Sequence, residues 1–144
     1  MNRLTLDKRL QELGIYSDFY YRKELKPLAQ VLDDREQLNC VLTGVHEGNR
    51  KLLAITDRRI IILFAGALAA RAVTVIRRSA VTAYRFEKKF LFSKVCISTA
   101  NDGDYEFAQT QGSLRDLFEW AMKRPIPDPK YHSNSILRFT YILP

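Results

Sequence analysis

Residues 56–64 read Thr-Asp-Arg-Arg-Ile-Ile-Ile-Leu-Phe, a polar corner that opens directly into the most apolar and β-prone run of the chain. The run Leu52 to Thr56 before the corner predicts one strand, and Ile60 to Phe64 predicts the next. Asp57-Arg58 then forms a two-residue connection. Aspartate tolerates the positive φ that a tight hairpin turn demands, whereas arginine is a poor second residue there. This hairpin corner decides the fold.

Short alternating runs on both sides of the corner predict further strands. The apolar period changes to two at Leu38, and Asn101-Asp102-Gly103 is a strong hairpin signal. Seven short strands with turn signals at near-regular intervals indicate an antiparallel barrel or sandwich in a mainly β, α+β fold class. The other runs are Leu38 to His46, Ala72 to Ile76, Ser79 to Phe86, Lys94 to Thr99 and Tyr105 to Gln109.

Helical patterns precede the strands. Leu6, Leu10 and Leu13 share one helical face that ends at Gly14, and Pro27 fits the first turn of a short helix. Between these two helices, we expect Ser17 or Asp18 to cap a segment whose aromatic side chains serve packing. These aromatic residues are Phe19, Tyr20 and Tyr21.

One amphipathic helix follows the strands. Ser113 is its expected N-cap, with Asp116 near the capping-box position, and the run Pro125 to Pro129 stops it. The expected organisation is a helical extension over residues 1–37, a barrel with its capping helix over residues 38–124, and an exit over residues 125–144. The tail from Ile136 to Leu143 is apolar enough to add a strand or to dock on a neighbour.

The stretch Leu53 to Ile62, Leu-Ala-Ile-Thr-Asp-Arg-Arg-Ile-Ile-Ile, resembles the "LxxTxxRxxF"-type corner of bacterial pleckstrin-homology-like domains of the YokE type, and GRAM domains carry a similar corner. The opening of the fifth strand at Ser79 and the helix from Leu25 to Leu32 resemble the same family. The resemblance implies a seven-stranded antiparallel barrel capped by a C-terminal helix. It also implies that Trp120 is a packing residue and that the chain is a binding module.

Eukaryotic lipid-binding members of this fold grip inositol phosphates with a basic motif that runs from the first strand into the second. The first strand here, Leu38 to His46, contains neither lysine nor arginine. Only Arg50 and Lys51 stand at the equivalent loop, and they are secondary candidates for a binding site.

The formal net charge of +7 is concentrated on the expected barrel, because residues 38–124 carry +6 of it. This placement favours a charged surface that faces nucleic acid, acidic lipid or an acidic protein partner. The fold that the resemblance implies gathers most basic residues at the barrel end opposite the usual lipid mouth. Alternatively, these charges solubilise strand ends and blunt edges. The candidates for anion or partner binding are Arg58, Arg59, Arg77, Arg78, Lys88, Lys89 and Lys94.

Catalytic and metal-binding motifs do not stand out, and we expect a non-enzymatic protein without cofactor or metal. Cys40 and Cys96 lack zinc-ligand spacing and are expected to be reduced core thiols. His46 and His132 are expected to be exposed, since neither has a serine or cysteine at motif spacing. Met1 to Gly14 has no apolar core of a signal peptide, so we expect a cytoplasmic protein, at most peripheral to the inner membrane face.

Three functions remain as hypotheses. The first is a module that self-associates and mediates protein–protein contacts, motivated by the apolar tail and the N-terminal leucine face. The second is peripheral binding to anionic lipid headgroups through the basic end. The third is nucleic-acid binding, for which Phe90 and Phe92 beside the lysines permit weak single-strand stacking.

Overall fold

The computed structural model describes residues 1–64, 72–100, 103–127 and 138–142. Its strands form one sheet in the order β5-β6-β7-β1-β2-β3-β4-β8, with antiparallel pairing throughout. The strands are β1 (Leu38–His46), β2 (Asn49–Thr56), β3 (Arg59–Phe64), β4 (Ala72–Arg77), β5 (Val81–Lys88), β6 (Ser93–Thr99), β7 (Gly103–Thr110) and β8 (Arg138–Ile142).

The seven predicted strands are confirmed, and the C-terminal tail adds an eighth. β8 pairs with β4, from Ala72↔Ile142 to Ile76↔Arg138. The strand order leaves β5 and β8 as edges of the sheet, so the predicted barrel is open rather than closed. The opening therefore lies between β5 and β8, and the 3-10 turn η1 (Arg78–Ala80) connects β4 to β5.

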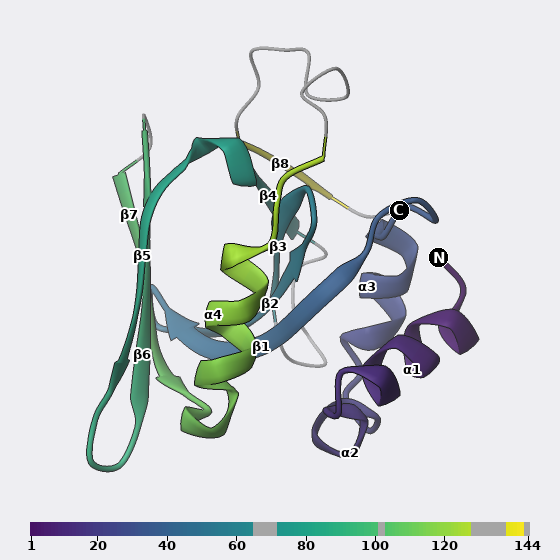
Figure 1. The fold of residues 1–144 in the computed structure, drawn as a ribbon, viewed down its shortest axis with the longest axis horizontal. Coiled ribbons are helices and arrows are strands. Elements are labelled where there is room, and N and C mark those ends of the chain that lie inside the picture. The colour runs from purple at the N-terminus through teal and green to yellow at the C-terminus, as the bar shows by residue number, and fades with distance from the viewer. Residues whose placement is uncertain (65–71, 101–102, 128–137, 143–144) are drawn as a thin grey trace.

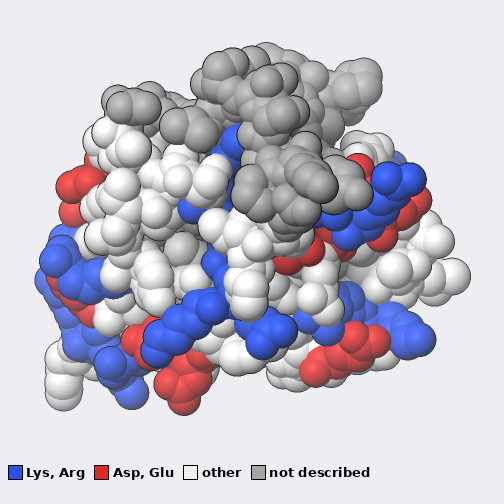
Figure 2. Space-filling view, turned by 45° about the horizontal axis from the view of Figure 1, so that its top comes forward, with Lys and Arg blue, Asp and Glu red and all other residues white. Residues whose placement is uncertain are grey.

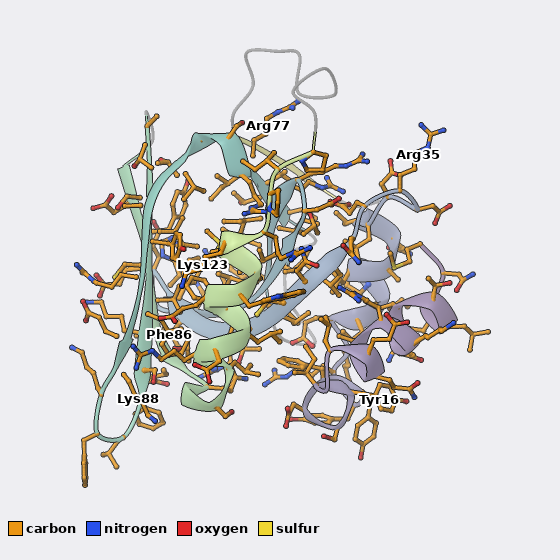
Figure 3. All side chains as sticks on the ribbon, in the orientation of Figure 1. Tyr16, Arg35, Arg77, Phe86, Lys88 and Lys123 are labelled. Atoms are coloured by element: carbon orange, nitrogen blue, oxygen red, sulfur yellow. The ribbon has the colours of Figure 1, made fainter. Side chains whose placement is uncertain are left out.

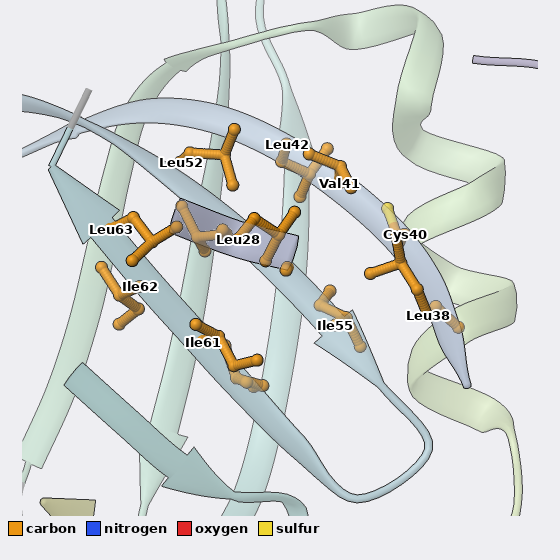
Figure 4. Close-up of a cluster of buried hydrophobic side chains, with 14 of the residues drawn as sticks. Leu28, Leu38, Cys40, Val41, Leu42, Leu52, Ile55, Ile61, Ile62 and Leu63 are labelled. Atoms are coloured by element: carbon orange, nitrogen blue, oxygen red, sulfur yellow. The ribbon is translucent and has the colours of Figure 1, made fainter. Parts of the chain in front are cut away.

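Helices cover both sides of the central strands (Figure 1). The N-terminal helices α1 (Arg3–Glu12), α2 (Tyr16–Phe19) and α3 (Leu25–Val31) lie beyond β1, and α4 (Arg115–Lys123) lies between β1 and β5. Since both faces are covered, consecutive positions of β1 are buried rather than alternate ones. The resulting core joins side chains of β1, β2 and β3 to Leu28 of α3 (Figure 4).

The N-terminal leucine face belongs to this core. Leu6 and Leu10 are fully buried, and Gly14, at φ 74°, ends the segment as its sequence predicts. The expected cap of α2 is wrong, because Ile15 precedes the helix and Ser17 lies inside it. Of the aromatic triplet, only Phe19 is a packing residue, because the two tyrosines that follow it are exposed.

The entry into α4 also differs from the prediction. Ser113 lies in a second 3-10 turn, η2 (Gly112–Leu114), and Leu114 precedes α4 without a side-chain cap. The helix is held by its apolar face instead, where Phe118 and Ala121 are fully buried. Trp120 is 41% exposed and carries Arg124 over its ring at 5.2 Å, so it is not a core residue.

Candidate functional site

The corner between β2 and β3 is organised by the Thr56 hydroxyl. Its Oγ1 accepts the backbone N–H groups of Arg58 at 3.1 Å and Arg59 at 3.0 Å, and donates to Glu36 Oε2 at 2.7 Å. Asp57 accepts from the backbone N–H of Gln37 at 3.0 Å. The positive φ expected at Asp57 is wrong, because the hydroxyl closes the corner with ordinary backbone angles.

Arg59, a predicted anion-binding residue, is committed to a buried carboxylate. Its Nη2 lies 2.6 Å from Glu36 Oε1, its Nε lies 2.9 Å from Oε2, and Nη2 also donates to the Val31 carbonyl at 2.8 Å. The Glu36 side chain is 1% exposed. Burial raises the pKa of Glu36, but the hydrogen bonds and charge of Arg59 outweigh it, and the pKa lies below its ordinary value.

Arg78 is likewise part of the framework. It is 5% exposed, and its Nη2 donates to the carbonyls of Met122 and Arg124, each at 2.8 Å. These carbonyls lie at the C-terminal end of α4, where backbone acceptors lack partners within the helix. The guanidinium therefore ties η1 to the end of α4.

The structure brings the four candidate arginines together but separates them from the lysines. Arg59 of β3 lies opposite Arg77 of β4 in the sheet. The backbone N–H of Arg78 donates to the Arg58 carbonyl at 3.0 Å. Lys88 lies at the far end of β5, roughly 25 Å away at the usual rise of a strand of 8 residues. Figure 3 shows Arg77 and Lys88 at opposite ends of the molecule.

The predicted single basic end is therefore wrong, because β5 runs away from the arginine corner and carries its last residues with it. Acidic groups also accompany several of these cations. Lys94 Nζ lies 2.8 Å from Glu106 Oε1, and Lys89 Nζ lies 4.0 Å from Glu87 Oε2. On the described part of the face in Figure 2, acidic side chains lie among the basic ones.

The secondary candidates at the β1–β2 hairpin are engaged within the chain. Arg50 Nη1 donates to Thr43 Oγ1 at 3.3 Å, and its Nη2 donates to Gln109 Oε1 at 3.2 Å. Lys51 Nζ lies 4.9 Å from the centre of the Phe64 ring. These contacts connect the β1–β2 hairpin to the end of β7 and to β3.

A cleft that the sequence did not reveal lies between β5 and α4. It has a volume of about 370 Å³ and is lined by Arg78, by Val81 to Tyr84 of β5, and by Met122 and Ile126. Because β5 ends the sheet, one wall of the cleft is a strand that pairs only with β6 in the described part of the chain. Arg78 Nε is buried here without a hydrogen-bond partner among the described residues.

Comparisons with known proteins find matches among solved structures. Neither a protein-family model nor a curated protein matches the chain. Among solved structures, it is similar to a pleckstrin homology domain from Shewanella amazonensis SB2B, at 16% identity and a TM-score of 0.45, over 69% of this chain and 96% of that chain. Independently of that likeness, the strand order and C-terminal helix are the pleckstrin-homology-like arrangement that the corner implied. The YokE subtype stays a prediction.

Histidine and cysteine residues offer little chemistry in the described part of the chain. His46 is half-buried against the rings of Tyr105 and Phe107, not exposed as expected, and its Nδ1 lies 3.0 Å from the Glu106 carbonyl. His132 lies outside the described residues. Cys40 and Cys96 are free thiols, and burial raises the pKa of Cys40. The described residues contain no group of three or more side chains suited to holding a metal ion.

Proposed function

We propose that the chain is a non-enzymatic binding module that holds an extended segment of another protein in the β5–α4 cleft. The observation that carries this proposal is the edge position of β5, which is also a wall of the cleft. An extended segment can add to such an edge through main-chain hydrogen bonds, while alternate side chains enter the adjoining cleft.

The lining of the cleft defines the chemistry of the segment. Met122 and Ile126 offer apolar surface opposite the strand, so the segment should carry apolar side chains on one face. Arg78 lines the cleft, and its positive charge favours acceptor groups in the segment. Lys123 and Arg124 are exposed at the adjoining end of α4, so acidic residues in the segment are favoured by charge.

Self-association is a second form of the same proposal. Two β5 edges can pair antiparallel about a two-fold axis, which joins the sheets of two copies. The N-terminal leucine face and the apolar tail give little support to self-association. The leucine face of α1 is buried in its own core, and β8 pairs with β4 of the same chain.

The proposal is tested with a library of displayed random peptides selected on the full chain. Ile126→Glu places a carboxylate at the apolar wall of the cleft, at a residue that is 40% exposed and therefore tolerant of substitution. Leu4→Glu is the matched control, because Leu4 is 81% exposed on α1, away from the cleft. We expect selected peptides to lose binding to Ile126→Glu and to keep it for Leu4→Glu. Equal binding to both variants would contradict the proposal.

Light scattering coupled to gel filtration decides between the two forms. A mass that doubles with concentration and returns to that of a monomer in Ile126→Glu identifies a second copy as the occupant. A monomer at all concentrations removes self-association and leaves a different protein as the partner. Cytoplasmic location and nucleic-acid binding stay predictions, and a gel shift at low salt tests the latter.

A further inference from the structure

The tip of the β5–β6 hairpin exposes three consecutive apolar side chains. Phe90 is 100% exposed, Leu91 is 77% exposed and Phe92 is 58% exposed. They lie between Lys88 and Ser93, the last cross-strand pair of the hairpin. Figure 1 shows this hairpin reaching past the start of α4 at one end of the molecule.

This exposure is unusual for a hairpin turn. Turns of this kind favour glycine, asparagine and aspartate, whose backbone or side chains suit the tight geometry. Single exposed apolar residues are ordinary, but a contiguous exposed group indicates a surface that meets an apolar environment. Phe86, on the same strand, is 7% exposed and belongs to the core, so the tip residues are separate from it.

Lysines flank the apolar tip on both strands. Lys88 and Lys89 precede it and are exposed, and Lys94 follows it with its side chain 23% exposed beside Glu106. Lys88 forms no ion pair with any described residue, and Lys89 Nζ lies 4.0 Å from Glu87 Oε2. Positive charge is therefore available next to the apolar side chains.

We infer that the hairpin tip, residues 88–94, inserts into the interface of a bilayer that contains anionic lipids. Phenylalanine and leucine suit the boundary between headgroups and acyl chains, and lysines beside them are attracted to anionic headgroups. Long lysine stems can cover apolar surface while the ammonium groups stay at the headgroup level.

The shape of the tip favours a membrane over the alternatives. Proteins that bind single-stranded nucleic acid track its backbone along a basic groove with stacking aromatics, whereas this tip is the end of a hairpin and has Leu91 at its centre. The inference is independent of the β5–α4 cleft, because that cleft is lined by Val81 to Tyr84 at the other end of β5.

Co-sedimentation of the full chain with phosphatidylcholine vesicles, with and without phosphatidylglycerol, tests the inference. The wild-type chain should bind the anionic vesicles and bind less as salt is raised. Replacing Phe90, Leu91 and Phe92 by serine should weaken this partition at least about tenfold. Lys88→Glu with Lys89→Glu should also abolish the preference for anionic vesicles.

Matched controls keep the test specific. Lys23→Glu with Lys26→Glu makes the same change of charge at exposed sites before and within α3. Serine at Leu4, Tyr20 and Tyr21 removes three other exposed apolar side chains. Both controls should keep vesicle binding, and far-ultraviolet circular dichroism should show all variants folded.

Insertion itself is read from fluorescence. In a Trp120→Phe background, Phe90→Trp places the single tryptophan at the tip, and its emission should shift to shorter wavelength with anionic vesicles. An unchanged emission, equal binding to neutral vesicles, or full binding by the serine variant overturns the inference. Binding of a single-stranded oligonucleotide in place of vesicles, or a change in oligomer mass without vesicle binding, overturns it as well.

Discussion

Arg59 and Glu36 form a two-bond ion pair beneath the β2–β3 corner, with Nη2 2.6 Å from Oε1 and Nε 2.9 Å from Oε2. The Thr56 hydroxyl, at the end of β2, donates to Oε2 of the same carboxylate at 2.7 Å. The segment before β1 is thereby fastened to the corner that decides the fold. The polar residues of this corner therefore stabilise the fold.

Glu36→Gln should lower the free energy of unfolding by about 3 kcal/mol, because it leaves a largely buried guanidinium without its counter-charge. Denaturant unfolding measures the loss. Glu119→Gln is the control, since its partner Arg115 is 48% exposed and a surface pair contributes under about 1 kcal/mol. Similar losses in the two variants would show that the Glu36 pair is not structural.

Acid should weaken the fold through the same carboxylate. The pKa of Glu36 lies below its ordinary value of 4.5 in the folded chain, so the unfolded chain takes up the proton first as the pH falls. The stabilisation is complete above about pH 4.5 and is lost as the pH falls through the lower folded pKa. Unfolding curves recorded from neutral to acidic pH should therefore converge for wild type and Glu36→Gln. A residual slope is expected from Asp33, whose pKa is lowered by the backbone N–H of Arg35.

Thr56→Val should cost about 2 kcal/mol, because two backbone N–H groups and the Glu36 carboxylate lose their hydroxyl partner. Thr56→Ser keeps the hydroxyl and should cost clearly less. Thermal melts of the two variants compare them directly. A serine variant as unstable as the valine variant would place the role of Thr56 in its methyl group.

Gly44→Ala should destabilise the chain by about 2 kcal/mol through overpacking where β1 pairs with β7. A Cβ at Gly44 would lie 2.8 Å from Phe107 Cβ and 2.9 Å from Thr110 Cγ2. Gly112→Ala is the milder control, because its nearest neighbour is the Ser93 hydroxyl at 3.0 Å, which can turn away. Equal losses of stability in the two variants on chemical denaturation would contradict this account of the packing at Gly44.

Local patterns were enough to predict the strands, and long-range contacts were not. The corner at Thr56 and the turn at Gly103 are encoded by neighbouring residues, so their strands were predicted correctly. The role of Arg59 was missed because Glu36 lies 23 residues away in the chain. The caps at Ser17 and Ser113 were wrong because packing and a 3-10 entry, rather than a side-chain oxygen, begin α2 and α4.

The candidate site depended even more on tertiary placement. Arg78 and Lys88 lie at opposite ends of β5, and this separation depends on the direction in which β5 runs through the sheet. The cleft forms because α4 lies beside the edge strand β5. No local sequence pattern encodes where α4 packs on the sheet. Thr82 and Ala83 are both exposed in β5, where strict alternation would bury one of them, and only the structure reveals this.

The most direct test of the proposed binding site is amide hydrogen exchange on the full chain with and without a saturating library-selected peptide. Strand addition predicts slower exchange of backbone amides within Val81 to Tyr84, and no such slowing in Ile126→Glu. Slowing that is confined to other segments, with Val81 to Tyr84 unchanged, would contradict the account.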